Sequence, residues 1–478
     1  MKILLINPKQ STSYAQPPMG LAMIAAILEK AGHDVLIADL GITAESEEGV
    51  ARHVINNGPS LVGISSTTPS ILSAAKIARN VKAASPNVHI ILGGAHASTL
   101  PEQTMEMMPD IDIIVRGEGE ATVVELVDAL ERERPLEQVK GIVFRDKGRK
   151  VWTEGRDPIS DLDQLPFPAY HLLPIKGYRF HPPLGRKHPV VPIITSRGCP
   201  FRCTFCTKSV FGQTYRSNSA KYVSKEIEYV IGRFQAREIK FYDDSFTLQR
   251  RRVIELCDEL VKREIDVPWS CETRVDLVDE ELLRVMKGAG CYMIEYGVES
   301  GNEGILEKMK KGISRQQVTK AFEATRAVGI QTVAYFMLGY PGETWDTARE
   351  TIEFAKRIQP DFVQFSVATP FPGTEFHELC REDKMKEDDW SRYVYADISG
   401  NQNALKLGTL IQGDAREFVR TAYVQFYLRW GYVWRRLASV KDVQDARVGL
   451  RGLAMLCKML GRPYLKSIFR GASSKTQL

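Results

Sequence analysis

The feature that most constrains the fold is an alternation of short apolar runs with amphipathic segments, which begins at the first residues of the chain. The apolar runs have strand length, and in the segments between them apolar residues recur at helical spacing. Such alternation predicts an α/β fold, here a doubly wound parallel sheet of the Rossmann or flavodoxin type. The predicted strands are 3–6, 34–38, 61–65, 89–92 and 111–115, and the predicted helices are 19–30, 45–56, 70–84 and 120–132.

A second block with the same alternation begins at residue 190. Its six β/α units predict a partial (β/α)6 barrel with a parallel sheet. Active sites of parallel barrels lie at the carboxyl ends of the strands, so polar residues at these ends are the first candidates for a site. The predicted strands are 190–195, 238–242, 268–273, 292–298, 331–338 and 362–368.

Three cysteines, Cys199, Cys203 and Cys206, follow the first barrel strand with the spacing C-x3-C-x2-C. Thiolates are soft ligands, and three of them on one loop can hold three irons of a [4Fe–4S] cluster. No fourth cysteine lies nearby, so one iron would stay open for a ligand. A zinc knuckle is the alternative, but structural zinc sites usually use two separated ligand pairs. The motif therefore predicts a cluster with an open iron.

With an aromatic residue, Phe205, before the last cysteine, this motif resembles that of the radical S-adenosylmethionine (SAM) superfamily. The resemblance implies that Cys199, Cys203 and Cys206 hold the cluster and take part in catalysis. SAM would bind the open iron and would be cleaved by one electron to methionine and a 5′-deoxyadenosyl radical. The protein would then bind and orient a cofactor that carries the difficult chemistry. Phe205 would pack near the adenine or, alternatively, anchor the loop.

Charged residues end the next two barrel strands. Asp243 and Asp244 follow the second strand, where they could bind SAM or a substrate, or one of them could cap the next helix. Arg274 ends the third strand and could bind a carboxylate through its planar fork, or could pair with Asp276. Asp243, Asp244 and Arg274 are therefore cofactor-binding candidates with structural alternatives.

Two later strand ends match the family in order and spacing. The resemblance implies that Glu299 accepts hydrogen bonds from the SAM ribose and that the loop from Gly339 to Glu343 flanks the adenine. The remaining cysteines show no ligand spacing and are expected to be small buried hydrophobic residues. They are Cys257, Cys271, Cys291, Cys380 and Cys457.

The strand-end loops of the first block carry Ser65, Thr67, Gly93 and Gly94, which allow close backbone approach and hydrogen bonding to a ligand. Together these loops resemble the cobalamin-binding domain that precedes many radical SAM domains. The resemblance implies that they line the corrin and its nucleotide tail. The D-x-H-x-x-G motif that supplies an axial histidine in other cobalamin proteins is absent, so we expect cobalamin without histidine ligation, and His96 to be an ordinary loop histidine. A domain that binds no corrinoid is the alternative.

The composition, 44% hydrophobic and 26% charged, is that of a globular protein with several domains. We expect a cobalamin-binding-like domain at 1–138, a hairpin and proline-rich linker at 139–189, the barrel at 190–385, and a basic amphipathic helical region at 386–478. The first residues read as a strand rather than a signal peptide, and the cysteines fit a reducing compartment. We therefore expect a cytoplasmic protein that works at low oxygen.

The net charge of +5 is concentrated in the last part of the chain, which has twelve Lys and Arg but only two Asp from residue 420 onward. Apolar residues from Val419 to Leu437 fall on one helical face, and those from Ala446 to Leu460 fall on a second. Such a region could lie on the cytoplasmic face of an anionic membrane or could cap the barrel. No recognised module supports nucleic-acid binding.

Together the motifs predict a cobalamin-dependent radical SAM methyltransferase that acts on an unactivated carbon of a small molecule. The aromatic basic tail favours a lipid-like or tetrapyrrole-like substrate. Flavodoxin or ferredoxin is the expected kind of electron donor. The alternatives are a radical oxidoreductase that closes a ring without methyl transfer, and a regulator that binds corrinoid or SAM without turnover.

Overall fold

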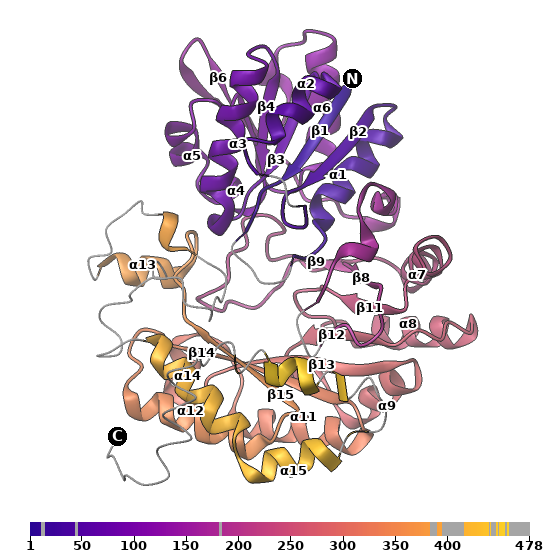
Figure 1. Ribbon diagram of the computed structural model, residues 1–478, viewed down its shortest axis with the longest axis vertical. Helices are drawn as coiled ribbons and strands as arrows, with labels where there is room; N and C mark the ends of the chain where they lie inside the picture. The colour runs from indigo at the N-terminus through magenta and orange to yellow at the C-terminus, as the bar shows by residue number, and fades with distance from the viewer. Residues whose placement is uncertain are drawn as a thin grey trace.

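The computed structural model describes residues 1–10, 15–43, 46–180, 184–382, 390–393, 415–438, 440, 446–447, 449–454 and 457. These residues form two α/β parts, an N-terminal domain and a half-barrel. In Figure 1 the N-terminal domain lies above the half-barrel, and one end of each sheet is directed toward the other part. The predicted fold class is confirmed in both parts.

The N-terminal sheet has seven strands in the order β2-β1-β3-β4-β5-β6-β7. Its first five strands pair in parallel and have the flavodoxin-like order, which reverses between β1 and β3. A ligand crevice is expected where the order reverses. The strands are β1 (Lys2–Asn7), β2 (Asp34–Asp39), β3 (Leu61–Ser65), β4 (His89–Gly93) and β5 (Ile113–Val115), and the helices are α1 (Met19–Lys30), α2 (Val50–Asn57), α3 (Ile71–Ala84), α4 (Ala95–Thr99), α5 (Pro101–Met107) and α6 (Glu120–Glu131).

The predicted hairpin forms as β6 (Ile142–Asp146) and β7 (Arg149–Trp152), and β6 pairs antiparallel with β5. It therefore extends the N-terminal sheet beyond residue 138, because Ile142, Val143 and Phe144 are buried in the core of that domain. The following segment packs against both parts of the molecule: the hydroxyl of Tyr170 donates to Glu226 and that of Tyr178 donates to Asp39.

The barrel sheet has six strands in the order β15-β14-β13-β12-β11-β8, all parallel. Several of its outer helices begin at Ser, Thr, Asp or Asn residues whose side chains accept a first-turn N–H, which explains where these helices start. The strands are β8 (Val190–Ile193), β11 (Glu238–Phe241), β12 (Trp269–Thr273), β13 (Cys291–Glu299), β14 (Gln331–Leu338) and β15 (Phe362–Val367). The helices are α7 (Ala220–Phe234), α8 (Arg250–Lys262), α9 (Glu280–Gly288), α10 (Glu303–Lys308), α11 (Arg315–Val328), α12 (Trp345–Ile358) and α13 (Glu375–Glu382).

The tail begins with α14 (Ala415–Tyr427), which lies along the outer face of the barrel beside β15 (Figure 1). The hydroxyl of Tyr423 accepts from the N–H of Phe365, and that of Tyr427 accepts from the N–H of Val363. These bonds satisfy the free edge of β15, which would otherwise be open to pairing with another chain. This part of the tail therefore caps the barrel, which was one of the two predicted alternatives. Val419, Tyr423 and Phe426 of the predicted helical face are buried.

The helical face does not continue unbroken, because α15 (Trp430–Ala438) is a separate helix. Trp430, Trp434 and Leu437 are among the most exposed large hydrophobic residues of the described chain. Leu460, the end of the second predicted face, lies outside the described residues. Among the residues described, no helix has the length and apolar character needed to cross a membrane.

Candidate functional site

The three motif cysteines lie on a loop between two short paired strands, β9 (Ser196–Arg197) and β10 (Arg216–Ser217). Gly198 opens the loop with φ +80°, and a Cβ there would lie 2.2 Å from the carbonyl oxygen of Thr214. Within the loop, the hydroxyls of Thr204 and Tyr340 lie 2.6 Å apart, and the Thr204 N–H donates to Met309. The loop is thus fixed to the barrel at both its start and its centre.

Asp243 and Asp244 have different surroundings although they are adjacent. Asp243 is buried and accepts hydrogen bonds from the backbone N–H groups of Thr195 and Ser196, at 2.6 and 2.9 Å. It therefore orients the chain that enters the cysteine loop, rather than capping α8. Asp244 is exposed beside Cys199 and remains the member of the pair that can reach a ligand.

The electrostatics of the loop favour a thiolate at Cys203, whereas burial raises the pKa of Cys199 and the hydrogen bond to Cys203 raises the pKa of Cys206. A hydrogen bond from Cys206, together with the charges of Lys311 and Arg274, lowers the pKa of Cys203 to about 6. Nη1 of Arg274 lies 4.0 Å from the Cys203 Sγ, and the same guanidinium forms a two-pronged pair with Asp276. Both alternatives for Arg274 thus meet in one geometry, because it pairs with Asp276 and also faces the cysteine loop.

A cubane cluster is compatible with this donor set. No group of three or more His, Cys, Asp or Glu side chains in the described ranges converges on a single ion. A cubane does not require such convergence, because each thiolate binds a different iron. The soft, spaced thiols of Cys199, Cys203 and Cys206 therefore fit the cluster better than a lone metal ion.

Glu299 and Lys311 form a nearly buried pair beside the cysteines, with 2.8 Å between the Glu299 Oε1 and the Lys311 Nζ. Glu299 has φ +67°, an unusual value for a residue other than glycine, at an irregularity in the pairing of β13 with β14. Such strained conformations persist where the surroundings hold them, often at functional sites. The bulge turns this carboxylate toward the loop.

Glu343 reaches back to the turn at Gly339, whose N–H donates to the Glu343 Oε2 at 2.5 Å. The other oxygen, Oε1, is buried without a hydrogen-bond partner. Burial raises the pKa of Glu343 to about 7, although the N–H groups of Gly339 and Tyr340 oppose this shift. An unpaired buried oxygen in this loop is a ready acceptor for a ligand.

Phe205 packs partly buried against an apolar cluster that includes Ile305, Tyr340 and Phe376. Its ring also lies 5.8 Å from the Lys311 Nζ. Phe205 therefore anchors the loop. Its approach to the adenine of SAM stays a prediction.

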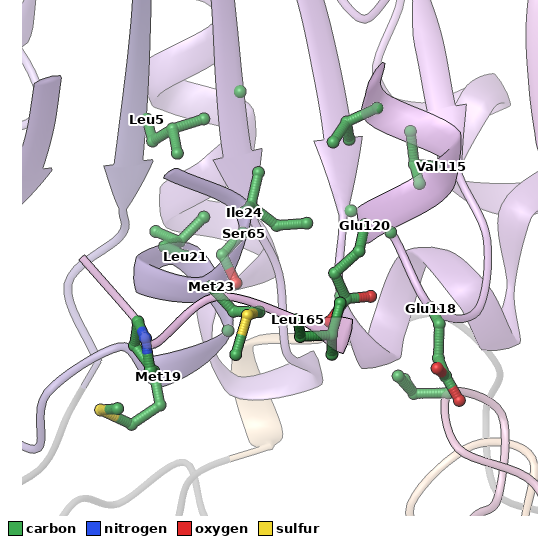
Figure 2. A pocket seen from close by; sticks show the side chains of 18 of the residues that line it. Leu5, Met19, Leu21, Met23, Ile24, Ser65, Val115, Glu118, Glu120 and Leu165 are labelled. Carbon is green, nitrogen blue, oxygen red and sulfur yellow. The ribbon is translucent and has the colours of Figure 1, made fainter. Parts of the chain in front are cut away.

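An apolar cavity lies at the carboxyl ends of the N-terminal strands, and it encloses about 1310 Å³ including the part open to solvent. Leu5, Ile24 and Val115 contribute apolar walls, and the carboxylates of Glu118 and Glu120 lie to one side (Figure 2). The predicted residues Ser65, Gly93 and Gly94 also line it. A cavity of this character fits the nucleotide tail of a corrinoid, which needs an apolar slot with few polar groups.

Gly94 shows why this loop needs glycine: its φ is +98°, and a Cβ would lie 2.4 Å from the carbonyl oxygen of Ser66. Thr67, by contrast, caps a short 3-10 turn at Thr68–Ser70 and is not among the cavity residues. Of the four predicted loop residues, Ser65, Gly93 and Gly94 therefore line the cavity, and Thr67 does not.

His96 is buried within the N-terminal domain. Its Nδ1 lies 3.1 Å from the Thr68 hydroxyl, and its ring packs edge-on against Trp390, 5.0 Å between centroids. Burial lowers the pKa of His96 to about 4. The side chain is thus enclosed by the domain and by a segment that follows the barrel, and it lies in the short helix α4 rather than in a loop as predicted.

Arg197 joins the two halves of the site, and the sequence reasoning missed it. Its guanidinium contacts Glu118 at 3.0 Å and Glu120 at 2.6 Å, and Arg216 contacts Glu118 at 2.5 Å. All of these side chains are nearly buried. Since Arg197 precedes the cysteine loop and Glu118 lines the cavity, the ion pairs fix the loop against the cavity. The only sequence feature that pointed to these ion pairs was the position of Glu118 and Glu120 at the end of a predicted strand.

Comparison with known proteins agrees with this geometry. The profile of the radical SAM superfamily matches residues 193–355, and that of the B12 binding domain matches residues 10–127. An uncharacterized methyltransferase of Pyrococcus horikoshii is 34% identical over 438 residues, covering 90% of this chain and 93% of that protein. The anaerobic magnesium-protoporphyrin IX monomethyl ester cyclase of Rubrivivax gelatinosus is 31% identical, covering 89% of this chain and 79% of that protein.

Among solved structures, the radical SAM methyltransferase TsrM of Kitasatospora setae, with cobalamin and a [4Fe–4S] cluster bound, has the same fold. Its TM-score is 0.68 at 20% identity, over 81% of this chain and 76% of that one. The chain therefore belongs to the radical SAM superfamily and carries a B12-binding domain. It is a cobalamin-dependent radical SAM enzyme whose cofactors are a [4Fe–4S] cluster, SAM and cobalamin.

Proposed function

We propose that the enzyme is a C-methyltransferase that adds a methyl group to an unactivated carbon of a lipid-like or tetrapyrrole-like small molecule. When bound, the cluster and SAM supply a radical that removes a hydrogen atom, and cobalamin supplies a methyl carrier. A one-electron donor such as flavodoxin or ferredoxin reduces the cluster. The methyltransferase from P. horikoshii supports this assignment.

The observation that carries the proposal is the buried junction of Arg197 with Glu118 and Glu120. It joins the cysteine loop to the loop that lines the apolar cavity. A substrate held between these loops could face both cofactors without a large domain movement. Holding reacting groups in a fixed geometry is a major source of catalytic acceleration.

In this proposal each residue of the barrel mouth binds or orients. Cys199, Cys203 and Cys206 hold the cluster. Arg274 offers a cation to the SAM carboxylate. Asp244 accepts from the SAM amino group, being the exposed carboxylate beside Cys199.

Two further carboxylates would position the nucleoside of SAM. Glu299, directed toward the loop by its bulge, accepts from the ribose hydroxyls. Glu343, with one unpaired buried oxygen next to Gly339, accepts from the adenine amino group. Phe205 packs beside the base.

A ring-forming oxidoreductase is the second candidate, because the cyclase of R. gelatinosus covers most of this chain. Such an enzyme would form 5′-deoxyadenosine but would leave no methyl group on its product. The two functions therefore differ in whether a methyl group is transferred to the product, which can be measured.

The proposal is tested by mass spectrometry of lipid and pigment extracts from anaerobic host cells with and without the gene. We expect the gene to be required for a species one methylene heavier than a precursor that accumulates in its absence. A precursor that differs by hydrogens, oxygen or a ring would instead support the cyclase function.

We also propose that α15 contacts an anionic membrane surface through Trp430, Trp434 and Leu437. These exposed side chains lie on a basic tail, and aromatic residues favour the membrane interface. Such contact would bring the enzyme close to a lipid-soluble substrate.

A further inference from the structure

The inner face of the barrel sheet carries polar side chains that no role above uses. Along the strands, side chains alternate between the two faces. Residues such as Phe241 and Phe336 point outward and are buried under the helices, whereas Glu272, Tyr335 and Gln364 point inward and keep part of their surface exposed. The interior is therefore open to a ligand at these positions.

A buried lysine organises this inner face. Lys240 of β11 is 1% exposed, contacts Glu295 of β13, and lies 3.1 Å from Glu272 of β12. Tyr335 of β14 donates its hydroxyl to the other oxygen of Glu295. Burial alone would lower the pKa of Lys240, but the charges of Glu272 and Glu295 more than offset it and raise the pKa. One lysine thus faces two carboxylates, of which Glu295 is buried with a pKa raised by that burial and Glu272 is partly exposed.

Three groups around this lysine have hydrogen-bonding capacity to spare. Glu272 is 40% exposed, and one of its oxygens has no partner in the part of the chain that the structure describes. The Tyr242 hydroxyl is buried without a partner. The Ser270 hydroxyl is fully buried one inward position before Glu272, bonds with the Tyr292 hydroxyl, and keeps acceptor capacity. Unpaired buried polar groups cost free energy unless a ligand or water satisfies them.

This polar region lies between a closed floor and the cofactor end of the barrel. At the floor, the Glu238 carboxylate accepts from the N–H groups of Gly185 and Lys187 and from the Tyr292 hydroxyl. At the other end, Arg274 is the next inward residue after Glu272, about 7 Å along β12, and faces Cys203. A molecule that enters from the cofactor end would meet Glu272 next.

We propose that Glu272, Tyr242 and Ser270 form a substrate subsite that takes a hydrogen-bond donor of the substrate, either an ammonium or a hydroxyl group. The partly exposed carboxylate of Glu272 favours such a donor and disfavours a substrate carboxylate. Lys240 and Glu295 are positioning residues that hold Glu272. The inference rests on the proposed function, because that function places the reacting carbon near the cysteine loop. It narrows the class of substrate to molecules with a hydrogen-bond donor near that carbon.

Binding is tested without turnover by soaking crystals of the SAM-bound holoenzyme in n-butylammonium chloride, 1-butanol or sodium butyrate at equal concentration. We expect density against Glu272 for the ammonium or the alcohol, with the ammonium lost in Glu272→Gln. Density for butyrate at this place, or for neither donor, would overturn the proposal.

A second test uses extract from anaerobic host cells that lack the gene, and measures how much extract half-maximally stimulates 5′-deoxyadenosine formation. Glu272→Gln should raise this amount at least about tenfold, because a charged hydrogen bond is lost. Glu281→Gln, the same change at an exposed position on α9, should not. Equal amounts for Glu272→Gln and wild type would overturn the subsite. Methylation is scored separately, so stimulation without methyl transfer would reject the proposed function and leave the subsite standing.

Discussion

At the scale of single residues, the carboxyl group of Glu343 shows how burial sets the chemistry of the loop that follows β14. Its pKa of about 7 lies above the ordinary value of 4.5, because burial disfavours the charged form. As pH rises, the unfolded chain loses this proton before the folded protein does. The group therefore opposes folding increasingly between pH 4.5 and pH 7, and by a constant amount above that range.

Replacing Glu343 with Gln should remove this pH-dependent cost. Relative to the variant, the wild-type apoprotein should lose about 3 kcal/mol of stability between about pH 5 and about pH 8. Urea unfolding of both proteins at the two pH values measures the difference. An identical pH dependence in both would contradict the assigned burial.

Each motif cysteine should be essential for SAM cleavage. Replacing Cys199, Cys203 or Cys206 with Ala removes one iron ligand, and 5′-deoxyadenosine should fall to background in the reconstituted enzyme. The matched control is Cys457→Ala, which should cleave SAM normally. Cys457 is exposed on the tail, contrary to the prediction that it is buried, whereas the other four non-motif cysteines are buried as predicted. Retained cleavage in any of the three variants would contradict the cluster assignment.

The cysteine loop could be predicted from sequence because its ligands lie within one short segment. Arg197 could not be assigned, because its partners Glu118 and Glu120 are 79 and 77 residues away along the chain. The open inner position of Glu272 was also beyond prediction, since it depends on how neighbouring strands pair.

At the scale of elements, the pairs between β9 and the loop before α6 join the two domains. Arg197→Met would leave Glu120 buried without its partner and Glu118 with Arg216 alone, and should destabilise the protein by about 3–5 kcal/mol. Arg250→Met removes a comparable double pair with Asp279 and Glu281 at the surface, and should cost less than about 1 kcal/mol. Urea unfolding compares the two, and equal costs would contradict a structural role for the junction.

The edge of β15 gives a second test at this scale. Tyr423→Phe and Tyr427→Phe each remove a hydroxyl bonded to the strand and should cost about 0.5–1.5 kcal/mol. Amide exchange at Val363 and Phe365 should become faster. The control is Tyr229→Phe, which removes a hydroxyl that has no hydrogen bond in the described chain. If amide exchange at β15 were unchanged in all three tyrosine variants, the capping role would be contradicted.

The helices and strands themselves were largely predictable, because periodicity marks them: α1, β3 and β14 have the predicted bounds. The break between α14 and α15 was not, since tertiary contacts of Tyr427 and Tyr432 with the barrel hold the two helices in different directions. The short helices α4 and α5 were missed because they are too short to show a period.

At the scale of the whole molecule, the tail caps the barrel and leaves one aromatic face outward. A Trp430→Ser, Trp434→Ser double variant should sediment less with vesicles of phosphatidylglycerol and phosphatidylcholine than the wild type does. Trp152→Ser, at an exposed tryptophan of β7, serves as the control. Sedimentation that is absent in the wild type, or equal in the double variant, would contradict membrane contact.

The arrangement of the two domains places the apolar cavity next to the cysteine loop. The apolar cavity and the cysteine loop are held together by Arg197, and the polar barrel interior lies behind the loop. The family could be predicted from the order of its motifs, whereas the substrate could not, because the groups that would bind it are dispersed over several strands.

The most direct test of the central claim is an assay of the reduced holoenzyme with trideuteromethyl-labelled SAM and the stimulating extract fraction. We predict a product that carries the trideuteromethyl group, with S-adenosylhomocysteine and 5′-deoxyadenosine formed in equal amounts. Formation of 5′-deoxyadenosine with an unlabelled product and no S-adenosylhomocysteine would contradict methyl transfer and would favour ring formation instead.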